Sequence, residues 1–143
     1  MNKVKIIYAT KTKHSKKIAL ALAKELNVLA ENIADKPSLG KVDLLFIVGG
    51  IYGGTSLPSL IEFAKSLDKE NIKSVVFVTS SVKKTQGQDA VREILDERGI
   101  TVLDEIHCQG SFLFMKFGHP NMIDIKETVE SSLKLSNRRI NEE

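Results

Sequence analysis

The chain has 143 residues but only one cysteine, three prolines and no tryptophan. Because Cys108 has no second cysteine to pair with, a disulfide within the chain is excluded. Long apolar runs are missing too: the longest, Leu44 to Val48, is far shorter than the ~18–20 residues that a membrane-spanning helix needs. The N-terminus shows no secretory leader pattern. These absences predict a cytoplasmic protein without a membrane span.

The composition indicates neither disorder nor nucleic-acid binding. Hydrophobic residues make up 42% and charged residues 27% of the chain, as in ordinary globular proteins. The net charge of +3 is too small a surplus to indicate nucleic acid as a partner. No repeat or linker interrupts the sequence, and its length suits one domain. We therefore expect a single domain over residues 1–143, in which residues 137–143 form a frayed tail.

Short apolar runs alternate with helical patterns along the chain. The predicted strands are residues 4–8, 27–30, 42–48, 73–78 and 100–109. The predicted helices have apolar residues at helical spacing: Ile18, Leu22 and Leu26; Leu57, Leu60, Ile61, Ala64 and Leu67; Ala90, Val91, Ile94 and Leu95; and Ile125, Val129 and Leu133. This alternation predicts an α/β fold, a doubly wound parallel sheet with helices on both faces.

Several element ends have local signals. Pro58 is expected at the start of the second helix, with Thr55 or Ser56 as its cap, and Gly99 just after the third helix. The last strand alternates like a half-exposed edge strand, with Glu105 on its polar face and an interruption at residues 103–104.

Acidic residues are distributed unevenly. Four stretches hold none: Ala9–Lys24, Leu44–Ile61, Asn71–Gln88 and Ile106–Ile123. Each spans or follows the carboxyl end of a predicted strand, which is where parallel sheets bind ligands. The pattern predicts an anionic ligand at this edge. The alternative is that loops next to glycine-rich turns lack acids by chance.

The segment after the first strand combines hydroxyl groups with positive charge. Its residues are Thr10, Lys11, Thr12, Lys13, His14 and Ser15. Hydroxyls and free N–H groups at a helix N-terminus bind anions, and a bound phosphate would offset the repulsion between lysines and the positive end of the helix dipole. The hypothesis is a phosphate-binding loop; the alternative is a solvated basic turn.

Other motifs for phosphate, nucleophilic or metal chemistry are incomplete. Gly49 and Gly54 have P-loop spacing, but Thr55 stands where the P-loop lysine belongs. His107 and Cys108 are neighbours on a predicted strand, so their side chains are expected on opposite faces. The three histidines lack metal-ligand spacing. We therefore predict no catalytic side chain and no metal site.

The run IIYATKTKHSKKIA resembles the first-strand and phosphate-loop signature of the flavodoxin family. The signature is an apolar strand ending in an aromatic residue, followed by Ser/Thr-x-Thr-x-x-Thr/Ser. The stretch CQGSFLFMKFGHPN also resembles a subgroup of flavodoxin domains with Cys-Gln-Gly and Gly-His-Pro-Asn segments. The resemblance implies a five-stranded flavodoxin-like sheet of order 2-1-3-4-5. It also implies an FMN cofactor whose phosphate contacts residues 10–15.

The resemblance further implies that the flavin ring lies between two later loops, residues 49–56 and 79–88. The residues expected at the ring are Gly50, Ile51, Tyr52, Gly53, Thr79, Ser80 and Ser81. Tyr52 is the candidate for packing on the ring, because aromatic faces attract beyond simple area burial. The alternative is that Tyr52 covers the sheet edge. Thr79, Ser80 and Ser81 are candidates for hydrogen bonds to the pyrimidine edge.

Flavodoxins are typically acidic, which disfavours the reduced, anionic flavin, whereas here Lys83 and Lys84 lie in the second flavin loop. We therefore expect the potential for formation of the flavin hydroquinone to be less negative than in acidic members of the family. We also expect an acidic redox partner. The predicted state is a monomer or weak dimer.

Three functions remain open at the level of sequence. The first is an FMN-binding electron carrier, which needs no catalytic side chain. The second is an FMN-dependent oxidoreductase, because GGIYGG and Phe63-Ala64-Lys65 loosely resemble flavodoxin-like protoporphyrinogen oxidases; quinone reduction belongs to this class. The third is a non-redox module that binds another phosphate ligand or a protein.

Overall fold

The computed structural model describes residues 3–9, 14–52, 55–81 and 88–109, together with Glu130 and Lys134. Its elements are, in chain order, β1 (Val4–Tyr8), α1 (His14–Leu26), β2 (Ala30–Asn32), the 3-10 turn η1 (Ile33–Asp35), β3 (Val42–Tyr52), β4 (Thr55–Ser56), α2 (Pro58–Lys65), β5 (Ile72–Ser81), α3 (Asp89–Glu97) and β6 (Thr101–Gln109). The predicted helix around Ile125 and the predicted tail lie outside the described residues, except that Glu130 and Lys134 are helical. None of the helices described is long and apolar enough to cross a membrane.

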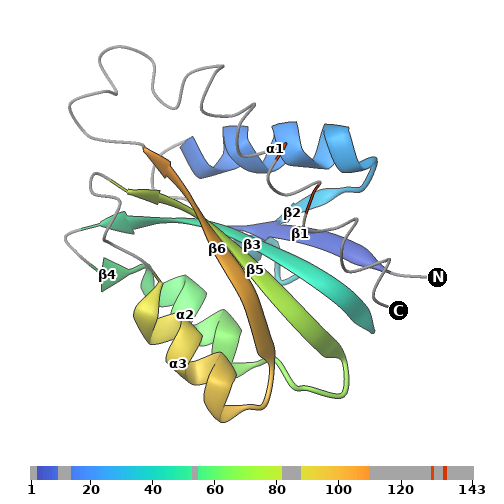
Figure 1. Ribbon diagram of the computed structural model, residues 1–143, viewed down its shortest axis with the longest axis vertical. Coiled ribbons are helices and arrows are strands. Elements are labelled where there is room, and N and C mark those ends of the chain that lie inside the picture. Colours follow the sequence, from blue (N-terminus) through green and yellow to red (C-terminus); the bar gives the residue numbers. More distant parts are fainter. Residues whose placement is uncertain are drawn as a thin grey trace.

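Five parallel strands form the sheet in the order β2-β1-β3-β5-β6, and the short β4 pairs antiparallel with the end of β3. Without β4, this is the predicted order 2-1-3-4-5. Figure 1 shows the strand arrowheads of β3, β5 and β6 pointing to the same end of the sheet. The chain leaves β1 to one side for β2 and then crosses to the other side for β3. The switch point therefore lies between β1 and β3, where such sheets bind ligands.

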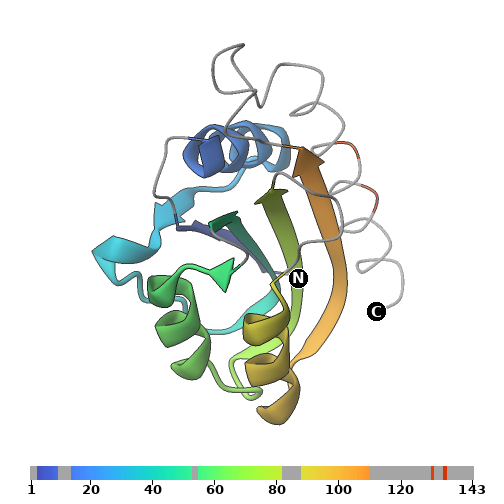
Figure 2. The same cartoon turned by 90° about the vertical axis from the view of Figure 1, so that its left-hand side faces the viewer.

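Helices cover both faces of the sheet, with α1 on one side and α2 and α3 on the other (Figure 2). Alternate strand residues separate two cores, because successive side chains point to opposite faces. Ile7, Leu45 and Phe77 pack on the α2 and α3 side, whereas Ile6 and Phe46 belong to the α1 side. Residues 44–50 are buried throughout, as the apolar run predicted for a strand covered on both faces.

Glycine and asparagine end two helices as the rules of helix termination require. Gly99 has a φ of 76° and follows α3, where Ile100 N–H donates to Leu95 O at 2.9 Å. This confirms the predicted end of the third helix. Asn27 has a φ of 56° and ends α1 in the same way, with Val28 N–H donating to Ala23 O at 3.1 Å. The strand predicted from residue 27 is therefore wrong at its start, and β2 begins at Ala30.

The predicted cap of α2 is also wrong. Leu57 is the N-cap residue and makes no side-chain cap bond. Thr55 and Ser56 instead form β4, because β3 continues past its glycines and pairs Tyr52 with Thr55 and Ile51 with Ser56. Pro58 does stand at the start of the helix, as expected from its fixed φ and missing N–H.

The interruption predicted in the last strand is a β-bulge. Val75 pairs with Val102, but Val76 pairs with Asp104, so Leu103 is the extra residue. Residues 101–106 of β6 are half-exposed or exposed, as predicted for an edge strand. The side chain of Glu105, however, is only 7% exposed.

Candidate functional site

The carboxyl ends of the strands bring the predicted site segments to one end of the molecule. Gly49 pairs with Thr79 and Gly50 with Ser80 across β3 and β5. Thr79 pairs in turn with His107 on β6. Tyr8, the last residue of β1, pairs with Val48 just before the glycines. The first residues of α1 and α3 lie at the same end as these strand tips in Figure 1.

The start of α1 holds a buried hydroxyl group. Ser15, the second residue of the helix, is 0% exposed, and its Oγ has no hydrogen-bond partner among the described residues. A buried polar atom without a partner costs about 1–3 kcal/mol, so a group that reaches it gains that energy back. The first turn has no acidic residue, and Lys16 and Lys17 are exposed. These features fit an anion at the helix N-terminus.

The other predicted phosphate-loop residues are less fully placed. His14 is the first helical residue of α1, and only its backbone is described. Thr10, Lys11, Thr12 and Lys13 lie outside the described residues.

Gly49, within β3, lies under close neighbours. A Cβ on Gly49 would stand 3.1 Å from Leu60 Cδ2 and 3.4 Å from Gln88 Nε2. Because glycine has no Cβ, β3 can pass close to Leu60 of α2 and to Gln88 at the start of α3. The backbones of Ile51 and Tyr52 continue β3, but their side chains and residue Gly53 lie outside the described part of the chain.

The end of β5 is held by a carboxylate that the sequence analysis placed on a polar strand face. Thr79 is 0% exposed, and its hydroxyl donates to Glu105 Oε2 at 2.7 Å. The hydroxyl proton of Thr79, a residue predicted to hydrogen-bond the flavin through its hydroxyl or its amide, thus has a protein acceptor in this structure. Ser80 and Ser81 pair by backbone with Cys108 and Gln109, and their side chains lie outside the described residues.

Glu105 accepts two further hydrogen bonds. Gln88 N–H donates to its Oε2 at 2.9 Å, and Arg92 Nη2 lies 3.1 Å from its Oε1. Arg92 also lies over the Phe77 ring, 5.8 Å from its centroid. The Thr79 hydroxyl, the Gln88 N–H and the charged Arg92 guanidinium group together offset the cost of burying this carboxylate. No local sequence pattern indicates this cluster, because its members are far apart along the chain; the only signal is the break in alternation just before Glu105.

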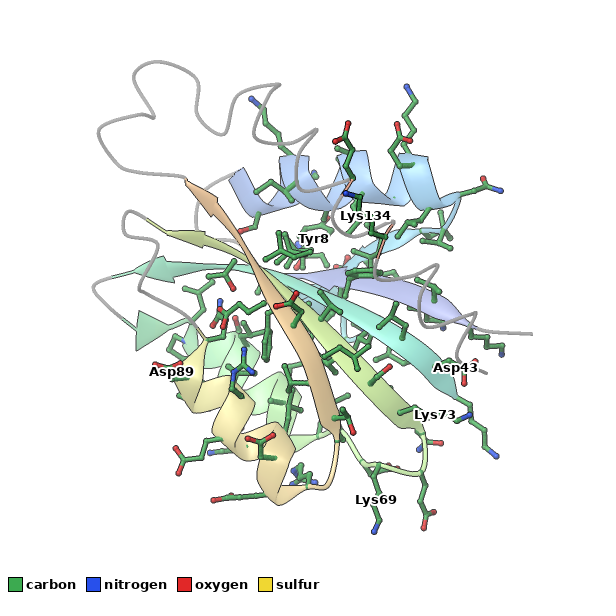
Figure 3. All side chains as sticks on the ribbon, in the orientation of Figure 1. Tyr8, Asp43, Lys69, Lys73, Asp89 and Lys134 are labelled. Atoms are coloured by element: carbon green, nitrogen blue, oxygen red, sulfur yellow. The ribbon has the colours of Figure 1, made fainter. Side chains whose placement is uncertain are left out.

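The edge is poor in acids but not free of them. Asp89 lies exposed at the start of α3, whereas Asp43 and Lys73 pair at the opposite end of the sheet (Figure 3). Asp89 and Glu105 directly flank two of the acid-free stretches in the sequence. Because Glu105 pairs with Arg92, its charge is largely balanced within the protein. Among the described residues, no group of histidine, cysteine and acidic side chains could hold a metal.

Comparison with known proteins identifies the family. The model of the flavodoxin domain family matches residues 5–125. This chain belongs to the flavodoxin domain family. The uncharacterized protein MJ0298 of Methanocaldococcus jannaschii is 34% identical to it over 131 residues, which cover 82% of this chain and 87% of that protein.

Solved flavodoxins share the fold. A flavodoxin from the domain Archaea superimposes with a TM-score of 0.66 at 14% identity, covering 96% of this chain and 98% of that one. A flavoprotein from Lactobacillus acidophilus NCFM, solved in complex with FMN, has a TM-score of 0.53 at 14% identity and covers 75% and 93% of the two chains. The sheet order and helix layers described above are therefore those of the flavodoxin fold.

Proposed function

We propose that this protein binds FMN at the carboxyl edge of its sheet and carries electrons between other proteins. The buried Ser15 hydroxyl supports the proposal most directly, because it lies at the start of α1 without a partner among the described residues. A phosphate oxygen is the acceptor that such a hydroxyl and the helix N-terminus together favour. Membership of the flavodoxin domain family supports a flavin as the rest of the ligand.

Two groups of residues would bind the two ends of the cofactor. The phosphate would contact Thr10, Lys11, Thr12, Lys13, His14 and Ser15. The ring would lie against Gly50, Ile51, Tyr52, Gly53, Thr79, Ser80 and Ser81. When bound, FMN supplies the electron-accepting and electron-donating chemistry, and the protein contributes binding, orientation and electrostatics. Because the Thr79 hydroxyl donates its proton to Glu105, Thr79 would meet the ring through its hydroxyl oxygen as an acceptor or through its backbone.

The direct test is binding of FMN and of riboflavin, which lacks the phosphate. Binding can be followed by the quenching of flavin fluorescence. We expect yellow protein after gel filtration with FMN, and binding of FMN at least ~10-fold tighter than binding of riboflavin, because charged hydrogen bonds stabilise by about 1.5–3 kcal/mol. Colourless protein and unchanged fluorescence would instead support a non-redox module.

Replacing the buried hydroxyl separates binding from stability. In Ser15→Ala we expect FMN affinity to fall about tenfold and riboflavin affinity to stay unchanged, because only the phosphate contact is lost. The melting temperature of the apoprotein should stay the same or rise, since an unpartnered buried hydroxyl disappears.

The matched control is Ser74→Ala. Ser74 is 2% exposed, and its hydroxyl donates to Asp43 O near the opposite end of β5. This variant should lower the melting temperature and leave both flavin affinities unchanged. A loss of riboflavin affinity equal to the loss of FMN affinity in Ser15→Ala would argue against a phosphate contact at Ser15.

A carrier and an enzyme differ in what the FMN-loaded protein consumes. We expect reversible electron exchange with redox proteins and no sustained turnover of a quinone or a porphyrinogen in the presence of a reductant or oxygen. Steady consumption of either substrate would contradict the carrier function and support an FMN-dependent oxidoreductase.

A further inference from the structure

One buried carboxylate holds two points of the chain that are nine residues apart. Glu105 Oε2 accepts from the Thr79 hydroxyl at 2.7 Å and from Gln88 N–H at 2.9 Å. Thr79 lies near the end of β5, and Gln88 is the N-cap residue of α3. Between them runs the segment expected to border the flavin ring. Glu105 therefore fixes both ends of that segment against β6.

The first turn of α3 adds two contacts to this cluster, both made by Arg92. Arg92 N–H donates to Gln88 O at 2.8 Å, and the Arg92 side chain returns to Glu105 Oε1 at 3.1 Å. Gln88 makes no side-chain cap bond of its own. The Glu105 carboxylate accepts from the N–H of this N-cap residue, which is the bond that the N3 side chain makes in a capping box. A negative charge is also favourable at the N-terminus of a helix.

Gln88 extends the contact to the other predicted flavin loop. Its side chain is 1% exposed, and its Nε2 lies 3.4 Å from where a Cβ on Gly49 would stand. Gly49 begins the GGIYGG run, and it pairs with Thr79 across the sheet. The same cluster thus joins the end of β3, the end of β5 and the start of α3.

From this geometry we infer that Glu105 is a positioning residue for the flavin ring: through Thr79 and Gln88 it sets the separation of the two loops between which the ring is proposed to bind. This inference rests on the proposed function. Glu105 acts through these two residues and does not itself contact the cofactor. The ring site would then depend on a β6 residue that lies outside both loops.

The test uses Glu105→Gln, which keeps the shape of the side chain but has one acceptor oxygen in place of two, so it cannot accept from Thr79, Gln88 and Arg92 at once. We expect affinity for FMN and for riboflavin to fall by the same factor, about tenfold, because the ring loops and not the phosphate site are disturbed. The visible circular dichroism of the bound flavin should change as well. Ser74→Ala serves as the matched structural control, with lower apoprotein stability but unaltered affinity and dichroism.

A second readout needs no cofactor. Amide hydrogen exchange of the apoprotein should become faster in Glu105→Gln for peptides covering residues 49–52 and 79–92, and stay unchanged for residues 42–46. If Glu105→Gln does not fold, Glu105→Asp gives the same comparison, because a carboxylate one methylene shorter cannot reach all three donors. The same changes, smaller in size, are expected.

The outcomes separate the two proposals. Absence of flavin binding by the wild-type protein would overturn the proposed function, and the ring-positioning role with it, even if the exchange comparison showed that Glu105 holds both segments. Flavin binding by the wild type together with wild-type affinity, dichroism and exchange in a folded Glu105→Gln would overturn the positioning role alone. A tenfold loss for FMN without a loss for riboflavin would also overturn it.

Discussion

Gly49 shows how much one missing Cβ matters at this site. An added Cβ would stand 3.1 Å from Leu60 Cδ2, and Leu60 is 0% exposed. We expect Gly49→Ala to lower the free energy of unfolding by about 1–3 kcal/mol, because the contact forces a shift in a packed core. Thermal melting of the apoprotein measures the loss.

A second substitution checks the cause of that loss. Leu60→Val shortens the side chain that Gly49→Ala would meet, so the double variant should be less destabilised than the sum of the two single variants. Additive losses would show that the glycine is needed for a reason other than its distance from Leu60.

At the level of single residues, the sequence and the structure agree on the surroundings of one candidate residue and differ on those of another. Ser15 was predicted to bind an anion, and it does lie buried at the start of α1, where its hydroxyl has no partner within the described segments. Glu105 was predicted on a polar strand face and is instead 7% exposed. Periodicity could not reveal this, because the bulge at Leu103 resets the alternation and the partners of Glu105 come from β5 and α3.

Among the elements, α3 ends in a way that a substitution can test. Gly99 has a φ of 76°, a left-handed conformation that costs other residues about 1–2 kcal/mol. We expect Gly99→Ala to lower the free energy of unfolding by about that amount. Gly99→Asn should lose less, because asparagine adopts this conformation more readily. Equal losses in urea unfolding would show that the left-handed φ is not the cause.

The elements that the sequence mispredicted share one physical reason. Thr55 and Ser56 look like helix caps before Pro58, yet they form β4 because β3 extends far enough to pair with them. Asn27 looks like the start of a strand, yet it ends α1 in a left-handed conformation. Local propensity is a weak preference, and in both cases a neighbouring element decides how the backbone hydrogen bonds are satisfied.

For the molecule as a whole, the charge pattern predicts the redox behaviour. With FMN bound, we expect the potential for formation of the fully reduced flavin to be less negative than in acidic flavodoxins, because few acids lie near the site. Lys16→Glu combined with Lys17→Glu takes the formal net charge from +3 to −1, since each replacement removes two positive units. This double variant should have a more negative potential in a redox titration. A potential unchanged by the reversal would contradict the electrostatic explanation.

The same field should control encounters with redox partners. Oxidation of the reduced holoprotein by the anion ferricyanide should become slower as salt is added, because screening weakens attraction to a basic surface. Oxidation by a cationic cobalt complex should become faster. Stopped-flow rates between about 10 mM and 0.5 M ionic strength measure both slopes. Faster oxidation by ferricyanide and slower oxidation by the cobalt complex as salt is added would exclude an acidic partner as the preferred one.

The sequence by itself determined the fold class and, through its family resemblance, the strand order, and it predicts an anion at the start of α1. The fold class and the predicted anion site follow from local patterns: apolar runs, helical spacing, and hydroxyls next to lysines. Only the tertiary structure decided that β3 runs on to pair with β4, and that Glu105 joins Thr79, Gln88 and Arg92. The physical reason is that a buried carboxylate is tolerated only where its donors converge, and these donors come from strands and helices whose proximity no local pattern records.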